Sequence, residues 1–310
     1  MSAIRTVFLG SGPFGVPALR GLATHPDVDL VGVVTAPPRP AGRGHAVRPT
    51  PVGEVARDLE GVTILRPLRL RDPESVASIL ALRPALAVLA DYGEIVPPAL
   101  LDLPHGALNL HPSLLPRHRG ASPIPATILA GDRETGVTLM RMDEGLDTGP
   151  IVAAERIPLD GTETAPQLEA RLADVAAGLL ARSIGRWLAG DLPATPQPAD
   201  RATLTRPLRR EDGRLDPAQT AADLERRVRG LQPWPGAFLE APTARLVVHA
   251  AHVEDGTADD DLGMLVPHGD GLALATADGR LVLDEVQPAG GRRMSAAALR
   301  RGRPGLVAGR

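Results

Sequence analysis

Residues 5–23, RTVFLGSGPFGVPALRGLA, read as a buried strand, a glycine-rich turn and an amphipathic helix. Similar apolar runs alternate with helical stretches along the first half of the chain. Strands are expected at 28–34, 63–65, 85–89, 106–110 and 137–142, and helices at 16–23, 73–82, 123–130 and 165–189. Because this alternation is typical of βαβ units, we predict an α/β fold with a parallel sheet, whose ligands bind beyond the carboxyl ends of the strands.

Length and composition favour a folded cytoplasmic enzyme of two domains. The chain has 310 residues, 43% hydrophobic and 23% charged, with a net charge of −3. No apolar run is long enough for a membrane span or a secretory signal. The absence of cysteine excludes disulfides and thiol catalysis, and the net charge argues against a uniformly basic nucleic-acid protein without excluding a local basic patch.

A Pro-rich stretch without periodicity separates the two expected domains. We predict a catalytic domain at 1–190, a linker at 191–209 and a carboxyl-terminal domain at 210–310. In the last domain, a helix at 218–229 precedes short strand-like runs with Gly and Asp turns. These runs, at 245–250, 263–266, 272–276 and 280–286, favour a small OB-like β-barrel.

The first turn carries a G-x-G-x-x-G pattern at Gly10, Gly12 and Gly15, in the strand–turn–helix context of a dinucleotide site. Such a site also needs an acidic residue at the end of the second strand, but that strand runs into Thr35 instead. Pro13 also removes a backbone donor from the turn. A tight structural turn is therefore favoured over NAD(P) binding.

Polar side chains emerge where the strand at 106–110 ends. Asn109 and His111 are two residues apart, so they point to the same face and can converge on one atom. Further along the chain, Asp147 lies between Gly145 and Gly149 in a loop that can approach His111 closely. Each residue alone also fits a packing or turn role, so the prediction of an active site depends on the sequence that surrounds the three.

The stretches NLHPSLLPRHRGASPI (109–124) and GDRETGVTLMRMDEGLDTGPI (131–151) resemble the folate-dependent formyltransferases. The resemblance implies a Rossmann-like catalytic domain without a nucleotide and 10-formyltetrahydrofolate as the formyl donor. It also implies that Asn109, His111 and Asp147 are catalytic. The folate-contacting loop corresponds to Ser113, Leu114, Leu115 and Pro116. No metal is expected, since the histidines lack metal-ligand spacing.

A second match is to the methionyl-tRNA formyltransferases, whose tRNA-entering loop resembles RPAGRG at 39–44. This likeness implies initiator methionyl-tRNA as acceptor, with Arg39, Arg43 and Arg48 as tRNA contacts, and we expect a monomer. The carboxyl-terminal motifs QPWPG (232–236) and QPAGG (287–291) extend the match to nearly the whole chain, and this match implies that the carboxyl-terminal domain at 210–310 binds tRNA. Asp91 departs from the apolar residue that the family usually carries before Tyr92-Gly93, so it affects the expected folate pocket.

Formyl transfer needs an oxyanion donor, a base and an acid, and three residues meet these needs. We expect Asn109 to donate its amide hydrogens to the formyl oxygen. His111 is expected to be cationic, its pKa raised by Asp147, and to serve as general acid. Asp147 or a bound water takes the amine proton.

Two other readings remain open. The first is a folate formyltransferase or hydrolase that acts on an amino sugar or releases formate. The second is a noncatalytic RNA-binding protein with a degenerate transferase core.

Overall fold

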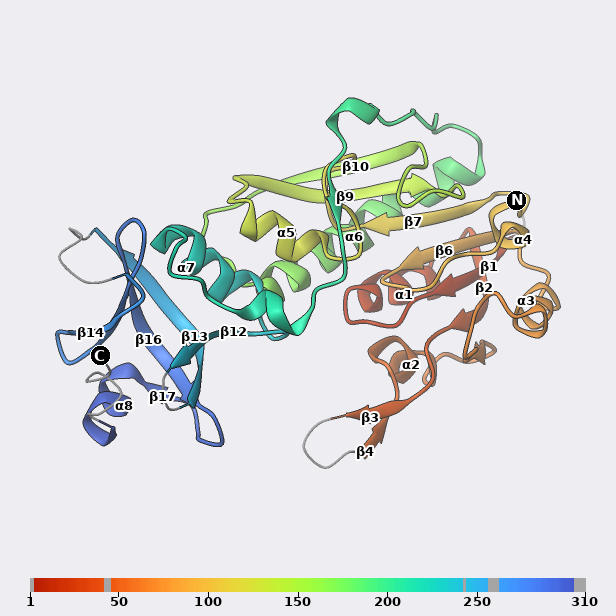
Figure 1. Cartoon of the computed structure of the whole chain (residues 1–310). Coiled ribbons are helices and arrows are strands. Elements are labelled where there is room, and N and C mark those ends of the chain that lie inside the picture. Colours follow the sequence, from red (N-terminus) through yellow and green to blue (C-terminus); the bar gives the residue numbers. More distant parts are fainter. Residues whose placement is uncertain (1–2, 42–45, 242–243, 256–261, 304–310) are drawn as a thin grey trace. The chain divides into compact units, whose positions relative to one another are not determined.

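The computed structural model describes residues 3–41, 46–241, 244–255 and 262–303, which divide into two compact units (Figure 1). Unit 1 comprises 1–123, 134–158 and 169–205, and unit 2 comprises 124–133, 159–168 and 206–310. Two helices cross the division of the chain, α5 (Pro123–Leu129) and α6 (Ala165–Leu188). The chain therefore passes between the units more than once.

Unit 1 is built on a seven-stranded sheet with the order β10-β9-β7-β6-β1-β2-β5. The five strands β1, β2, β5, β6 and β7 are parallel, while β9 and β10 run antiparallel to them. The bounds are β1 (Ile4–Leu9), β2 (Val28–Val34), β5 (Thr63–Leu65), β6 (Leu86–Ala90), β7 (Ala107–His111), β9 (Glu134–Arg141) and β10 (Ile151–Pro158). Every residue of β6 is buried, as expected for a central strand covered on both faces.

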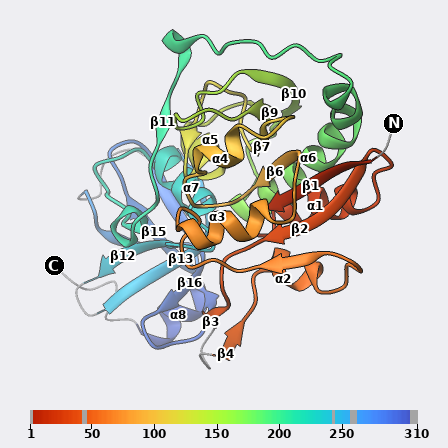
Figure 2. The same cartoon turned by 90° about the vertical axis from the view of Figure 1, so that its right-hand side faces the viewer.

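Shorter elements complete unit 1. They are α1 (Gly15–Ala23), β3 (Arg39–Ala41), β4 (Ala46–Arg48), α2 (Pro51–Ala56), α3 (Pro73–Leu80), α4 (Pro98–Leu101), β8 (Arg119–Gly120), η1 (Ala199–Arg201) and β11 (Leu204–Thr205). Helix α2 begins where Thr50 accepts a hydrogen bond from the Gly53 amide and Pro51 fills the first turn. The β3–β4 hairpin projects from the sheet in both views (Figures 1 and 2).

Strand order reverses between β1 and β6, because β1 leads through α1 to β2 on one side while β6 leads to β7 on the other. At such a switch point the loops after the two strands diverge and leave a crevice outside the carboxyl ends. The Gly10–Gly15 turn follows β1, Asp91 follows β6, and β7 ends in His111. The topology thus brings these three features to one edge of the sheet.

Unit 2 contains an antiparallel sheet in the order β12-β13-β16-β15-β14, with β17 paired to β16. Its elements are η2 (Arg210–Gly213), α7 (Ala221–Gly230), β12 (Ala237–Ala241), β13 (Ala244–Glu254), β14 (Leu265–His268), β15 (Gly271–Ala275), β16 (Arg280–Pro288), β17 (Met294–Ser295) and α8 (Ala296–Gly302). Helix α7 packs on β13 and β16. Apolar residues that include Leu224, Val248 and Leu283 form the core between them.

The predicted fold class is confirmed: an α/β unit with a mainly parallel sheet precedes a separate antiparallel sheet. Among the described residues, β12 and β14 are the edges of the second sheet. The structure divides the chain between 205 and 206, inside the segment 191–209 that the sequence predicts as a linker. Residues up to Thr205 hydrogen-bond into unit 1, because the segment carries side chains that bond to the site loops.

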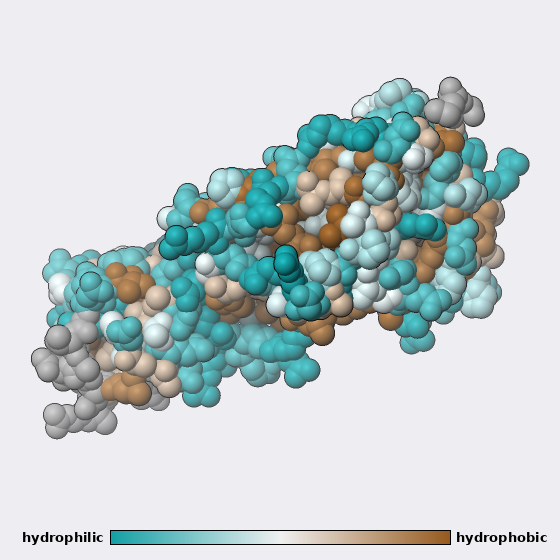
Figure 3. All heavy atoms as spheres, turned by 90° about the horizontal axis from the view of Figure 1, so that it is seen from above, coloured by the Kyte–Doolittle hydropathy of each residue, from teal (hydrophilic) through white to brown (hydrophobic). Residues whose placement is uncertain are grey.

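The surface is mainly hydrophilic on the face shown in Figure 3, with apolar residues between the polar ones. Leu68 and Leu204 are examples of large apolar side chains that remain mostly exposed. Within the described ranges, no helix has the length and apolar character needed to cross a membrane.

Candidate active site

Asn109 and His111 lie at the carboxyl end of β7, where the strand reaches the edge of the sheet. Asn109 is the one residue of this strand that is not fully buried, and its side-chain amide makes no hydrogen bond within the described part of the chain. His111 is buried, with a side chain only 5% exposed. Both side chains point to the same face of the sheet, so the amide donors of Asn109 are available beside the imidazole.

Both ring nitrogens of His111 have defined neighbours. Nε2 lies 2.9 Å from the carbonyl oxygen of His118, and Nδ1 lies 3.6 Å from Oδ2 of Asp147. A carbonyl oxygen only accepts, so Nε2 must carry a hydrogen in this arrangement. Nδ1 is therefore the ring atom left free to exchange a proton, and it faces the carboxylate. The predicted approach of Asp147 to His111 is confirmed.

The prediction that His111 is cationic is wrong. Burial lowers the pKa of His111, and this effect exceeds the rise that the charge of Asp147 and the hydrogen bond to the His118 carbonyl produce. The sequence showed the carboxylate, but it did not show that the imidazole would be removed from solvent. His111 is therefore neutral at rest near pH 7, with a base at Nδ1 rather than an acid.

The position of Asp147 is fixed by its backbone conformation and by a hydrogen bond from β8. Its φ angle of 52° places it in the left-handed region, which Asp tolerates better than most residues. Oδ2 accepts a hydrogen bond of 2.7 Å from the amide of Gly120. At Gly149 an added Cβ would lie 1.9 Å from the Arg141 carbonyl oxygen, so the loop closes only with glycine there. These contacts fix the carboxylate beside Nδ1.

Gln197, in the predicted linker, connects the loop that carries Asp147 to β8. Its side-chain nitrogen donates to the carbonyl oxygens of Asp147 and Gly149 at 2.8 Å and 2.7 Å. Its side-chain oxygen accepts from Nε and Nη2 of Arg119, a residue that is only 8% exposed. One amide therefore positions the catalytic loop and satisfies a buried guanidinium.

Two threonines of the same segment hold the loop that carries His118. The Thr203 hydroxyl accepts from the His118 amide at 2.8 Å, and the Thr205 hydroxyl accepts from the Ser122 amide and donates to the Arg119 carbonyl. Strand β11 also pairs with β8. Gln197, Thr203 and Thr205 could not be recognised from the sequence, because a Pro-rich segment without periodicity gives no signal that its polar side chains bond elsewhere.

Replacing Gln197 by Ala should lower kcat by roughly 10- to 100-fold, because the Asp147 carboxylate loses its positional support and small misplacements are costly in catalysis. Gln197→Glu is a second test variant of nearly the same shape. It keeps an acceptor for Arg119 but loses the amide donor and turns a carboxylate oxygen toward two carbonyl oxygens. We expect both variants to be impaired, with unchanged KM for the folate. Steady-state kinetics beside thermal unfolding checks this, and a kcat for both variants within about twofold of wild type would contradict it.

The loop predicted to contact folate turns most of its side chains inward. The Ser113 hydroxyl donates to the Arg117 carbonyl at 2.6 Å, and Ser113, Leu115 and Pro116 are buried. Leu114 alone of the four predicted residues is partly exposed. A folate contact by this loop remains a prediction, and the structure leaves the Leu114 side chain and the backbone to make it.

The three glycines of the first turn are explained by the end of β6. A Cβ at Gly10 or Gly15 would lie 2.7 Å or 2.8 Å from the Ala90 carbonyl oxygen, and one at Gly12 would overlap the Asp91 carboxylate. Such close approach requires glycine whether or not a nucleotide binds. The contacts therefore agree with the structural interpretation of the motif.

Asp91 forms an electrostatically coupled pair with Glu169 of α6. Asp91 is exposed at the sheet edge, but the protein partly surrounds its carboxyl group. This partial burial raises the pKa of Asp91 above the ordinary value of 3.8, while a hydrogen bond from the Gly12 amide lowers it. Burial and then the charge of Asp91 raise the pKa of Glu169. Asp91 also has a positive φ of 55°. The two carboxylates, both in unit 1, therefore repel each other when both are charged.

The raised pKa of Asp91 predicts a pH-dependent stability effect. The folded chain binds this proton more tightly than the unfolded chain, so the free energy of unfolding falls as pH rises from 3.8 through the raised pKa. Asp91→Asn, which suits the positive φ, should therefore be more stable than wild type at pH 7, and this gain should fade as pH falls through the raised pKa toward 3.8. Urea unfolding across pH measures the difference.

The pKa of Glu169 provides a second measurement of the same interaction. Asp91→Asn should also lower the pKa of Glu169, which NMR titration of that carboxyl carbon detects. Equal stability of wild type and Asp91→Asn at pH 7, with an unmoved Glu169, would show that the two carboxylates do not interact.

The predicted tRNA contacts lie on the β3–β4 hairpin. Arg39 and Arg48 are register partners across the two strands, and both are exposed. Neither forms an ion pair with another described residue. Like charges directly opposite each other destabilise a hairpin, so the pair suits an anionic ligand. Arg43 lies outside the described residues.

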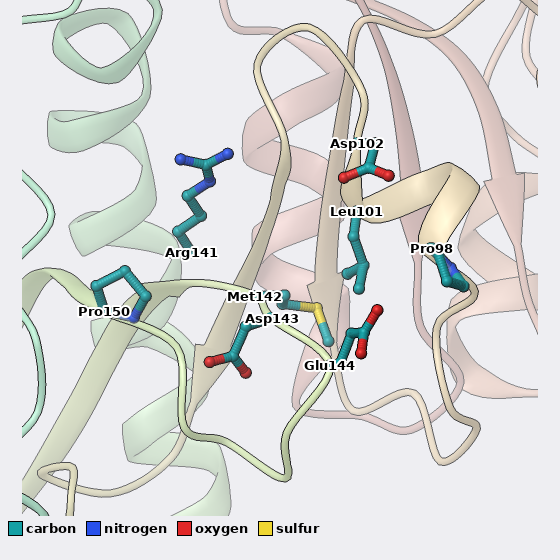
Figure 4. Close-up of a pocket in the computed structure, with 8 residues that line it drawn as sticks. All are labelled: Pro98, Leu101, Asp102, Arg141, Met142, Asp143, Glu144 and Pro150. Carbon is teal, nitrogen blue, oxygen red and sulfur yellow. The ribbon is translucent and has the colours of Figure 1, made fainter.

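A cavity of about 310 Å³ opens at the start of the Asp147 loop (Figure 4). Its lining combines one guanidinium with three carboxylates and four less polar residues: Pro98, Leu101, Asp102, Arg141, Met142, Asp143, Glu144 and Pro150. None of the three predicted catalytic residues lines it. No three His, Asp or Glu side chains of the described ranges gather where they could hold a metal ion.

The chain is similar to known formyltransferases over nearly its whole length. The family model described as "Formyl transferase" matches residues 4–184, and "Formyl transferase, C-terminal domain" matches 207–304. A methionyl-tRNA formyltransferase of Roseiflexus sp. (strain RS-1) is 46% identical over 303 residues, which cover 96% of this chain and 92% of the relative. Another, of Thermus thermophilus, is 42% identical, and the match covers 96% of each chain.

Solved structures share the fold at low sequence identity. An N-formyltransferase from Helicobacter canadensis, in complex with folinic acid and dTDP-3-aminofucose, matches with a TM-score of 0.66 at 15% identity. The match covers 94% of this chain and 100% of that one. HypX from Aquifex aeolicus, in complex with tetrahydrofolic acid, matches with a TM-score of 0.63 at 17% identity and covers 96% of this chain and 47% of the other.

Proposed function

Since this chain belongs to the formyltransferase family, we propose that it transfers the formyl group of 10-formyltetrahydrofolate to the amino group of methionyl initiator tRNA. The observation that carries the chemistry is the unbonded Asn109 amide beside a neutral imidazole whose free nitrogen faces Asp147. The choice of acceptor rests on the full-length likeness to methionyl-tRNA formyltransferases.

Asn109 supplies the oxyanion donor. When the amine attacks the formyl carbon, the carbonyl oxygen becomes an alkoxide that needs hydrogen-bond donors already in place. The Asn109 amide meets this need because no described group of the protein competes for its hydrogens. Its position in a buried strand keeps the donor fixed while charge develops.

His111 moves the proton. A neutral Nδ1 accepts the proton that the amine loses as its bond to the formyl carbon forms. The imidazolium that results is stabilised by the Asp147 carboxylate at 3.6 Å and by the His118 carbonyl at Nε2. The same proton then passes to the folate nitrogen as its bond to the formyl carbon breaks, so His111 ends neutral.

Bound at the carboxyl edge of the sheet, 10-formyltetrahydrofolate supplies the activated formyl group. The site suits it in two respects: the partly exposed Asn109 amide can face the formyl oxygen, and Leu114 provides an apolar contact. In α/β sheets such a ligand binds outside the carboxyl ends of the strands, next to the switch point, which here lies between β1 and β6. No metal has a role in this mechanism.

The β3–β4 hairpin serves as a tRNA contact in this proposal. Arg39 and Arg48 present two guanidiniums that pair with no described carboxylate, and the segment 35–52 contains no acidic residue. Arginine suits phosphate because its planar donors bind two oxygens at once. The paired arrangement matches successive negative charges of an RNA backbone.

Replacing Arg39 and Arg48 by Ala should weaken binding of methionyl-tRNA and flatten its salt dependence by about one unit of slope for each lost phosphate contact. Arg20→Ala is a matched control, since α1 runs back from the binding edge and Arg20 lies exposed in its last turn. The measurement is a salt series of tRNA affinity for the three proteins. An unchanged affinity and slope in the double variant would leave an amino-sugar acceptor as the better proposal.

A further inference from the structure

Trp234 is unusual among the few aromatic residues of this chain, which has only two Trp, one Tyr and three Phe. The other five are buried or partly buried: Phe8, Phe14, Tyr92, Trp187 and Phe238. Trp234 is 56% exposed, in the loop between α7 and β12 of unit 2. A large apolar ring in water forgoes the free energy of burial, so its exposure points to a binding role.

The loop that carries Trp234 is anchored on both sides of it. The Gln232 side chain donates to the carbonyl oxygens of Val228 and His249, both at 2.9 Å. On the other side, the Gly236 amide donates to the Leu231 carbonyl at 2.9 Å, and Gly236 has a φ of 75° that favours glycine. The indole is therefore presented from a fixed backbone.

Cationic side chains without carboxylate partners lie on the segment next to this loop. Helix η2 approaches so closely that a Cβ on Gly213 would lie 2.0 Å from the Gly236 carbonyl oxygen, and Arg214 forms a bridge with Phe238. Arg209, Arg210 and Arg214 are exposed, and none forms an ion pair with a described residue.

Two acidic residues also lie on this segment, but they leave the three cations available. Asp212 is engaged by Arg206, and a side-chain hydrogen bond from that arginine lowers the pKa of Asp212 to about 2. Glu211 is exposed between the cations. An exposed aromatic ring beside free guanidiniums is the combination that binds single-stranded nucleic acid, where the ring stacks on a base and the cations hold phosphates.

We propose that Trp234 stacks on an unpaired base of the tRNA acceptor, with the guanidiniums of Arg209, Arg210 and Arg214 on the adjoining phosphates. The inference rests on the proposed function, in which tRNA is the acceptor. The new element is a stacking contact in unit 2 that recognises an unpaired nucleotide, whereas contacts to phosphates alone would also bind a duplex. Stacking tolerates any base, so the contact contributes affinity more than sequence preference.

The test uses the full-length protein. The chain has only two tryptophans, so Trp187→Phe leaves Trp234 as the sole indole fluorophore. We expect initiator methionyl-tRNA to quench this fluorescence to saturation, while an RNA duplex without unpaired bases does not. Trp234→Leu should raise KM for methionyl-tRNA about tenfold, with kcat and KM for the folate unchanged. Trp234→Phe, which keeps a ring, should recover most of the affinity.

Three outcomes overturn the inference: no quenching by methionyl-tRNA, equal quenching by the duplex, or an unchanged KM in Trp234→Leu. A packing role for the indole is separated by thermal unfolding, since it predicts a lower melting temperature for Trp234→Leu without quenching in the single-tryptophan protein. If wild type transfers no formyl group to methionyl-tRNA, the proposed function itself fails. If wild type is active with methionyl-tRNA but Trp234→Leu has an unchanged KM for it, only the stacking contact is rejected.

Discussion

His111→Ala is expected to lower kcat for formyl transfer by roughly 100-fold or more, since it removes the group that accepts the amine proton and returns it to the leaving nitrogen. Asp147→Ala should cost a similar amount, because the imidazolium loses the carboxylate 3.6 Å from Nδ1. The two residues act as one proton-transfer unit, so the double variant should be little worse than either single variant. Single-turnover transfer to methionyl-tRNA measures all three rates.

Two features make this test specific. His25→Ala is a matched control, because His25 follows α1 at the opposite edge of the sheet, where its ring bonds to the Ala181 carbonyl. The low pKa of His111 also predicts that activity falls as pH drops into the range where Nδ1 becomes protonated. Transfer by His111→Ala within about threefold of wild type would contradict the proton-transfer role.

Asn109→Ala should lower kcat by roughly 100- to 1000-fold, the usual effect of removing one oxyanion donor. The fold should persist, because the side-chain amide bonds to no other described residue. KM for the folate should change little, since the hydrogen bond strengthens only as negative charge develops on the formyl oxygen.

Asn109→Asp separates this role from simple packing. The carboxylate has nearly the same shape but offers no donor and repels the oxyanion, so it should be at least as damaging as Ala. Circular dichroism and thermal unfolding establish that both variants fold. If Asn109→Asp retains more than about a tenth of the wild-type rate, the oxyanion is held by another group.

The central strands of unit 1 could be predicted because burial on both faces demands continuous apolar runs. The strand expected at 85–89 is β6 at Leu86–Ala90, and the one expected at 106–110 is β7 at Ala107–His111. Strand β10 was missed, since it lies at the edge of the sheet and its sequence mixes charged with apolar residues. The six residues of α2 are too few to show helical periodicity.

Residue types and spacing revealed part of the candidate site, while contacts and burial determined the rest. The approach of Asp147 to His111 followed from a strand end and a glycine-flanked loop. The His118 carbonyl that fixes the imidazole tautomer could not be foreseen, since a backbone acceptor leaves no mark in the sequence. Gln197 was hidden for a similar reason: its partners are backbone oxygens far away along the chain.

The most direct test of the central claim is to offer the enzyme three acceptors with formyl-labelled 10-formyltetrahydrofolate: methionyl initiator tRNA, a dTDP-linked amino sugar and water alone. The account predicts label on the methionyl amino group, abolished in Asn109→Asp, with transfer to the sugar and release of formate at least about 100-fold slower. Faster transfer to the sugar, or formate release that tRNA does not suppress, would contradict it.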